Sequence, residues 1–115
     1  MKSEVRLTLA GEERLLACPL GAIEEIARVE PKLRQALDDL AAGTWSFRLV
    51  RVVLSATLRA GHEAEGRSGD PLSADVVIEE DGLAAAAIAA RLALGTAFFR
   101  EGDVEPGKQD AAANE

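Results

Sequence analysis

The sequence predicts an α+β fold that is mainly α, with an N-terminal β-hairpin packed on a bundle of about five helices. Polar and apolar side chains alternate near the N-terminus, which is the period of a half-buried strand. Farther along, apolar side chains recur every three or four positions between Pro, Gly and Ser residues, which is the pattern of helices and their boundaries. The 115 residues are enough for one core, so we expect a single domain over residues 1–100 and a disordered, acidic tail over residues 101–115.

The hairpin is expected within the first part of the chain. Glu4 to Leu9 alternates polar and apolar residues, Ala10 to Glu13 contains the turn, and Arg14 to Cys18 is the return strand. The apolar residues of the first strand share one face. A lone two-stranded hairpin is marginally stable in water, so this face must rest on helices or pair with another chain.

Two short helices are expected to follow the hairpin. Pro19 to Gly21 breaks the strand, and Ala22 to Glu30 has the apolar spacing of a helix. Pro31 separates it from a second helix over Lys32 to Ala42, which Gly43 closes.

The central helix of the fold is expected from Phe47 to Ala60, after an N-cap at Ser46. It is apolar almost all the way round, and apart from Thr57 its polar residues share one narrow stripe, at Arg48, Arg51, Ser55 and Arg59. A helix that is polar along only one ridge is mostly buried. Gly61 is expected to end the helix with a positive φ.

A polar loop and two further helices complete the predicted domain. The loop covers His62 to Asp70, and Ser73 caps a helix that runs through Glu80. Gly82 ends that helix, and Leu83 to Arg100 forms the last one.

The composition favours closely packed helices. Hydrophobic residues make up 48% of the chain, and 22 residues are Ala, the strongest helix former and small enough to let backbones approach. The net charge of −7 disfavours nucleic acid and anionic membranes as partners. Residues 60–115 carry twelve Asp or Glu and four Lys or Arg, so this half is either a contact face or a means of keeping the protein soluble.

The sequence predicts a cytoplasmic protein. The N-terminus becomes polar again before any long apolar run, so no secretory signal is predicted. The most apolar segment, Leu83 to Phe99, has Arg91 near its middle, which costs about 2.5–3.5 kcal/mol at the centre of a bilayer. The single cysteine, Cys18, cannot form an internal disulfide and fits a reducing compartment.

We expect no catalytic, cofactor-binding or metal-binding residues, and therefore no enzyme activity and no cofactor. A Ser or Cys nucleophile needs a neighbouring base, and the one histidine, His62, lies in a loop. One Cys and one His cannot supply the three or four ligands of a zinc site. The acidic groups either hold a hard cation, form a general acid/base pair or, more simply, remain solvated on the outer sides of helices. They are Glu24-Glu25, Asp38-Asp39 and Glu79-Glu80-Asp81.

Two sets of residues are candidates for protein binding. The arginine stripe on the central helix either pairs with Asp38, Asp39 or the 79–81 run of this chain, or meets a partner's carboxylates. The last helix has two apolar ridges, so either both are buried or one is left for a second chain. The ridges are Ile88, Leu92, Gly95 and Phe99, and Ala87, Ala90, Leu94 and Phe98. The candidate protein-binding residues are Leu92, Phe98, Phe99, Arg48, Arg51 and Arg59.

Short motifs follow the hairpin in a recognisable order. They are Pro19-Leu20-Gly21-Ala22-Ile23-Glu24-Glu25-Ile26, Leu37-Asp38-Asp39-Leu40-Ala41-Ala42-Gly43, Leu58-Arg59-Ala60-Gly61, Leu72-Ser73-Ala74-Asp75 and Gly82-Leu83-Ala84-Ala85-Ala86-Ala87. Together with the capped apolar helix between them, they resemble the small proteins of the gene-transfer-agent family, which are grouped with phage tail assembly chaperones. The resemblance covers residues 5–99 and brings no catalytic residues with it.

The resemblance implies a non-enzymatic tail assembly chaperone of a phage-like particle or gene transfer agent, which binds tape-measure or tail-tube protein during assembly. Such a protein covers apolar segments of its client until the tube polymerises. A minor structural tail component or adaptor of the particle stays open as an alternative, and so does a small dimeric regulatory or adaptor protein. The expected partners are phage-like tail proteins or another copy of the chain, and not nucleic acid or a membrane.

Overall fold

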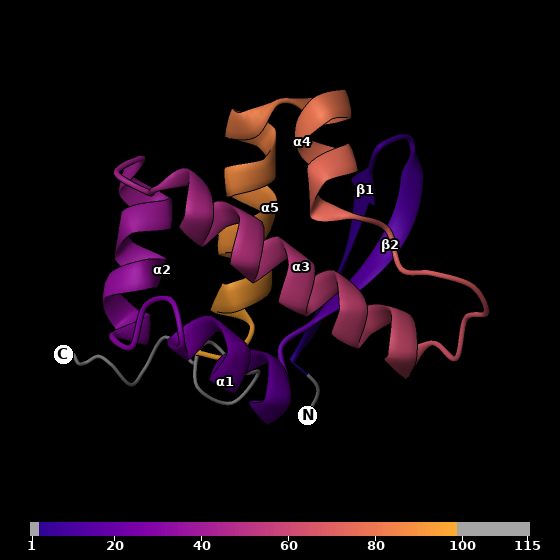
Figure 1. The fold of residues 1–115 in the computed structure, drawn as a ribbon, viewed down its shortest axis with the longest axis horizontal. Coiled ribbons are helices and arrows are strands. Elements are labelled where there is room, and N and C mark those ends of the chain that lie inside the picture. Colours follow the sequence, from indigo (N-terminus) through magenta and orange to yellow (C-terminus); the bar gives the residue numbers. More distant parts are fainter. Residues whose placement is uncertain (1–2, 99–115) are drawn as a thin grey trace, which may run out of the picture.

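The computed structural model describes residues 3–98 and has the predicted fold class, an α+β arrangement that is mainly α. Its elements are β1 (Glu4–Leu9), β2 (Glu12–Ala17), α1 (Leu20–Ala27), α2 (Leu33–Ala42), α3 (Phe47–Ala64), α4 (Ala74–Asp81) and α5 (Leu83–Gly95). The predicted tail, residues 101–115, and the candidate binding residue Phe99 lie outside the described residues. Figure 1 shows α3 crossing the middle of the molecule, with the hairpin to its right, α2 to its left and α1 below.

The hairpin closes through a two-residue turn, and the predicted turn over Ala10 to Glu13 is wrong. β1 and β2 are antiparallel, and β2 begins at Glu12 instead of Arg14. Ala10 and Gly11 both have positive φ, 51° and 82°, which matches the twist of a tight hairpin. The Asp81 carboxylate accepts a hydrogen bond from the Ala10 N–H at 2.9 Å, and this bond ties the uncommon Ala conformation to the end of α4.

The central helix α3 begins as predicted but ends about one turn later. The Ser46 hydroxyl caps it by accepting a hydrogen bond from the Leu49 N–H at 3.0 Å. The prediction that Gly61 ends the helix is wrong, because Gly61 lies inside α3 where the helix passes β2. A Cβ at this position would lie 1.8 Å from the Leu15 carbonyl oxygen, so only glycine lets the two backbones approach this closely.

The first short helix, α1, begins and ends earlier than predicted, at Leu20 and Ala27 rather than Ala22 and Glu30. It begins early because the Pro19 carbonyl already accepts a helical hydrogen bond, at 3.0 Å. It ends early because a proline follows Glu30, and the residues before a proline are pushed out of the helical conformation.

The last helix, α5, ends at Gly95, before the predicted end at Arg100, which lies outside the described residues. The next three N–H groups donate to carbonyls three positions back, which replaces the α-helical pattern with a tighter turn. The Thr96 hydroxyl also donates to the Ala93 carbonyl at 2.6 Å and competes with the helix for it.

The other predicted boundary residues behave as expected. Gly43 ends α2 in the left-handed conformation, with φ of 81°. The Ser73 hydroxyl caps α4 by accepting the Asp75 N–H at 3.1 Å. Gly82, with φ of 93°, separates α4 from α5.

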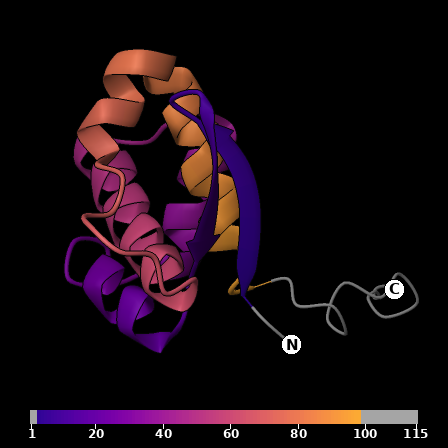
Figure 2. The same ribbon diagram turned by 90° about the vertical axis from the view of Figure 1, so that its right-hand side faces the viewer.

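One apolar core joins the hairpin to the five helices of the described chain. Figure 2 shows the hairpin lying along α5, in agreement with the contacts between β1 and α5. Much of the core consists of small side chains, as the composition predicts, because α5 buries Ala86, Ala87, Ala89, Ala90 and Ala93. Thr57 is the one buried polar residue among residues 3–98, and its hydroxyl donates to the Val53 carbonyl at 2.7 Å.

Candidate functional site: an apolar groove beside the open edge of the hairpin

The hairpin has one edge that is covered and one that is open. Gly61 of α3 lies against the Leu15 carbonyl, so the outer edge of β2 is covered by a helix. No element of the described chain pairs with the outer edge of β1, since the sheet has two strands. A row of backbone hydrogen-bonding groups along β1 therefore has no strand partner in the described chain.

The register identifies the exposed backbone groups. Leu9 and Glu12, which flank the two-residue turn, form a hydrogen-bonded pair. Along an antiparallel ladder, hydrogen-bonded pairs alternate with pairs whose backbone groups point outward. The Cys18 N–H, which donates to the Ser3 carbonyl at 2.8 Å, fits this alternation. The backbone N–H and C=O groups that point outward from β1 are those of Glu4, Arg6 and Thr8.

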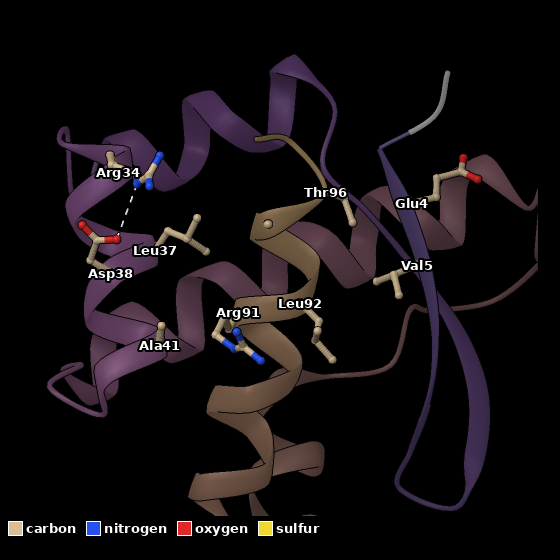
Figure 3. Close-up of a pocket in the computed structure, with 10 residues that line it drawn as sticks. Glu4, Val5, Arg34, Leu37, Asp38, Ala41, Arg91, Leu92 and Thr96 are labelled. Atoms are coloured by element: carbon tan, nitrogen blue, oxygen red, sulfur yellow. Dashed lines mark ion pairs between the residues drawn. The ribbon is translucent and has the colours of Figure 1, made fainter. Parts of the chain in front are cut away.

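A groove runs beside this open edge, between β1 and α5. It consists of two hollows, of about 460 and 420 Å³, that meet at Leu92. No residue of β2 lines either hollow, so the groove lies on the open side of the hairpin. Figure 3 shows Leu92 pointing from α5 towards β1 and Val5 pointing from β1 towards α5. The larger hollow reaches α2 at Leu37 and Ala41, and the smaller one reaches the hairpin turn at Gly11.

The walls of the groove are apolar and partly exposed to water. Ile88 is 56% exposed and Leu92 is 39% exposed, one turn apart on α5. Val5 and Leu7 of β1 are half-buried on the opposite wall. Neighbouring apolar side chains that remain exposed on a folded protein are typical of an interaction site.

Charged side chains stand at the α2 end of the groove. Arg34 and Asp38 form an exposed ion pair within α2, at 3.5 Å. Arg91 lines the same hollow and has no ion-pair partner within residues 3–98. Figure 3 shows the Glu4 carboxylate on the side of β1 that faces away from α5. The unpaired cation of this hollow within residues 3–98 is therefore the Arg91 guanidinium, whereas the smaller hollow contains the Asp81 carboxylate, which accepts the Ala10 N–H.

The Arg6 side chain is held away from the groove. Its guanidinium donates to the Glu65 carboxylate at 2.7 Å, just beyond the end of α3. This hydrogen bond raises the pKa of Arg6 and lowers that of Glu65. The backbone of Arg6 stays accessible at the edge while its side chain is tied to the other face.

The candidate arginines of α3 lie on a different surface, and two of them are paired within the chain. Arg51 donates to both oxygens of Asp75, at 2.8 and 2.9 Å, and Arg59 donates to Glu25 at 2.6 Å. The hydrogen bond to Glu25 raises the pKa of Arg59. Of the two readings, internal pairing therefore holds for these two arginines.

The predicted acidic partners of the arginines are wrong. The Asp38 carboxylate pairs with Arg34, and that of Asp39 accepts from Gln35 within α2 and from Thr44 just beyond its end. Arg51 pairs with Asp75 in the first turn of α4, and not with a carboxylate of the 79–81 run.

Arg48 has no ion-pair partner in the described part of the chain. It borders a shallow hollow of about 340 Å³ with the other two arginines, Val52 and Ser55.

The two ridges of α5 differ in burial. Ala87, Ala90 and Leu94 are buried, whereas Ile88 and Leu92 are exposed. Phe98, at the end of the buried ridge, is half-buried and packs against the core. Of the candidate residues Leu92, Phe98 and Phe99, it is Leu92 that lines the groove. Phe99 lies outside the described residues.

The sequence reasoning missed the β1 wall of the groove. The alternation placed Val5 and Leu7 on one face of the strand, which was expected to rest on helices or pair with another chain, and neither was among the candidate binding residues. The available signal was the two-stranded hairpin itself, since a sheet of two strands leaves an edge that must be covered or used.

The reactive residue types take no part in the groove. Cys18 is 1% exposed, and burial raises the pKa of its thiol to about 11, so it stays protonated at neutral pH. His62 Nε2 lies 2.9 Å from the Gly69 carbonyl oxygen. Within residues 3–98, no group of three or more His, Cys, Asp or Glu side chains is placed to hold a metal ion. No helix in that range is long and apolar enough to cross a membrane.

A scan against protein-family models and searches of curated proteins and of solved structures found no match for this chain. The function therefore has to be inferred from the groove and from the order of the sequence motifs.

Proposed function

We propose that this protein is a non-enzymatic, cytoplasmic assembly chaperone of a phage-like particle or gene transfer agent, and that it binds tape-measure or tail-tube protein during assembly. The observation that carries the proposal is the apolar groove between β1 and α5, with Ile88 and Leu92 exposed on one wall. The resemblance of the motif order to tail assembly chaperones supports the choice of client.

The groove suits transient binding of an apolar segment. Complete burial of a Leu or Ile side chain contributes about 1.5–3 kcal/mol. From the exposed fractions of Ile88 and Leu92, a client that covers both side chains gains roughly 1.4–2.9 kcal/mol from them. This gain corresponds to about a 10- to 100-fold change in Kd, large enough to select a client and small enough to release it.

The experiment that tests the proposal is affinity capture of the tagged protein from cells that express the full tail gene cluster, followed by mass spectrometry. The test variant is Leu92→Glu, which puts a charge on the wall of the groove. The matched control is Phe47→Glu, because Phe47 is 51% exposed and lines a different hollow beside α4. Thermal unfolding of both variants is measured alongside, so that loss of capture is compared only between folded proteins.

We expect tape-measure or tail-tube protein to be captured by the unmodified chain and by Phe47→Glu, and to be lost with Leu92→Glu. Capture that Leu92→Glu leaves unchanged contradicts the assignment of the groove. Recovery of the protein alone, together with its presence in finished particles, favours the alternative of a minor structural tail component or adaptor. A stable dimer that captures no tail protein favours the alternative of a small regulatory or adaptor protein.

A further inference from the structure

We propose that the groove binds its client as an added β-strand, paired along β1, with apolar side chains at alternate positions and a carboxylate beside Arg91. This inference rests on the proposed function for the identity of the client, but its physical basis is the geometry of the groove. It specifies the conformation of the bound segment and the chemistry of its side chains.

The hairpin can pair with an added strand along one edge only, the outer edge of β1. The outward N–H and C=O groups of Glu4, Arg6 and Thr8 bind nothing in the described chain, and they recur at every second residue. The β2 edge cannot accept a strand, because α3 lies against it at Gly61 and Leu15. An added strand therefore has a single place to bind, and its backbone hydrogen bonds would supply affinity without regard to sequence.

The groove has the length and the walls that a strand needs. β1 has six residues, and at about 3.3 Å per residue it extends roughly 20 Å. The two hollows follow it from Glu4 to Gly11, on the side away from β2. One face of an added strand would lie against Ile88 and Leu92, whereas its other face would point to solvent. Alternate apolar residues satisfy this requirement.

The charge in the larger hollow favours an acidic group on the client at that end of the groove, whereas the Asp81 carboxylate lines the other end. Four charged residues line the larger hollow: Glu4, Arg34, Asp38 and Arg91. Arg34 and Asp38 pair with each other, and the Glu4 carboxylate points away from α5 (Figure 3). The Arg91 guanidinium remains for a carboxylate of the bound segment, which would fix the position of the strand along the groove.

The test uses the full chain and a defined peptide. The peptide has eight residues and blocked ends, with Val or Leu at every second position, Thr between them and Glu at one end. Two further versions of the peptide carry N-methyl groups on alternate amides: one on the odd-numbered amides and the other on the even-numbered amides. In an added strand one set of N–H groups points at β1 and the other points away, so one version loses its hydrogen bonds and the other keeps them.

We expect binding to weaken at least about tenfold with one N-methylated version and to stay within about twofold with the other. Amide hydrogen exchange of Arg6 and Thr8, followed by NMR, slows at least about tenfold when the unmodified peptide binds. The Leu7 amide, which already donates within the hairpin, changes little and is an internal control.

A variant of the protein tests the same pairing from the other side. Thr8→Pro removes one outward N–H without removing a hydrogen bond of the hairpin, and Thr8→Val is the matched control. We expect Thr8→Pro to weaken peptide binding at least about tenfold and Thr8→Val to leave it within about twofold. The N-methylated peptides, used with the unmodified protein, keep the test valid if Thr8→Pro unfolds the hairpin.

Four results would overturn the proposal. They are a Kd above about 1 mM for the unmodified peptide, equal effects of the two N-methylated versions, unchanged exchange at Arg6 and Thr8, and protection of these two amides in the free protein that rises with its concentration. The last result would mean that β1 pairs with a second copy of the chain.

The two proposals can fail separately. Captured tail protein that leaves the Arg6 and Thr8 amides unprotected would refute strand addition and leave the chaperone function intact. Peptide addition to β1 without capture of any tail protein would refute the chaperone function and leave strand addition intact.

Discussion

Replacement of Gly61 by alanine tests whether α3 and β2 are in direct backbone contact. In an ordinary helix interior, Gly→Ala stabilises a protein by about 0.5–1 kcal/mol, because glycine loses more backbone entropy on folding. Here the added Cβ would lie 1.8 Å from the Leu15 carbonyl oxygen and 2.5 Å from its carbon. The clash is with backbone on both sides, so no side-chain rotation relieves it.

The magnitude follows from the movement that the clash requires. Cβ contacts below 3.0 Å essentially never occur in proteins, so α3 and β2 must separate by more than an ångström at this point. Forced repacking of a core costs about 1–3 kcal/mol, and the helix-propensity gain offsets at most about 1 kcal/mol of it. Because the clash is with backbone and no rotamer relieves it, its cost lies near the upper end of this range. We therefore expect a net destabilisation of about 2 kcal/mol, which lowers Tm by roughly 8–16 °C for a domain of this size.

The assay is thermal and urea unfolding of Gly61→Ala beside a matched variant, Gly21→Ala. Gly21 is also helical, in α1, but no atom lies within 4 Å of the position of its Cβ. We expect Gly21→Ala to equal or exceed the wild-type stability, by up to about 1 kcal/mol. If Gly61→Ala is as stable as the wild type, the close approach of α3 to β2 is refuted, and with it the claim that the β2 edge is covered.

Two further predictions concern other parts of the fold. Burial raises the pKa of Cys18 from 9.0 to about 11, so the unfolded state loses its proton first, and stability falls between about pH 9 and pH 11. Compared with Cys18→Ala, which lacks this titration, the wild type should lose on the order of 2 kcal/mol across that range in urea unfolding, and parallel curves would contradict the burial of the thiol. The Arg51–Asp75 pair is bidentate but half exposed, so a double-mutant cycle with alanine should give a coupling of about 0.2–1 kcal/mol that decreases in 1 M salt. A coupling above about 2 kcal/mol, or one that salt leaves unchanged, would contradict this account of an exposed pair.

The parts of the fold that the sequence predicted correctly depend on local chemistry. The alternation in Glu4–Leu9 and the apolar spacing in the helices each reflect one element's own geometry. The caps at Ser46 and Ser73 act within a few residues of the chain, as does the left-handed conformation of Gly43.

Two of the incorrect boundaries, at Gly61 and at the hairpin turn, involve contacts between distant segments. Gly61 has the usual appearance of a helix end, but it is required by the Leu15 carbonyl of a strand far away in the sequence. At the two-residue turn, the Ala10 N–H donates to the Asp81 carboxylate, which is also far away in the sequence. The sequence patterns around Gly61 and Ala10 include neither Leu15 nor Asp81, so these patterns could not reveal the two contacts.

The candidate site was predicted only in part, because it also depends on contacts between distant segments. The spacing in α5 places Leu92 and Leu94 on different ridges, but the packing of α3 and the hairpin decides which ridge is buried. The β1 wall of the groove comes from the opposite end of the chain, so periodicity within α5 could not reveal it. The arginines of α3 were correctly grouped on one stripe, whereas the positions of α1 and α4 determine their acidic partners.

The most direct test of the central claim is an NMR titration of the ¹⁵N-labelled protein with the tail protein that it captures. The account predicts that the largest shift changes fall on β1 and on the Ile88–Leu92 face of α5, with little change on the arginine stripe of α3. Changes confined to the hollow around Arg48, Arg51 and Arg59 would contradict it and would place the client on the opposite candidate surface.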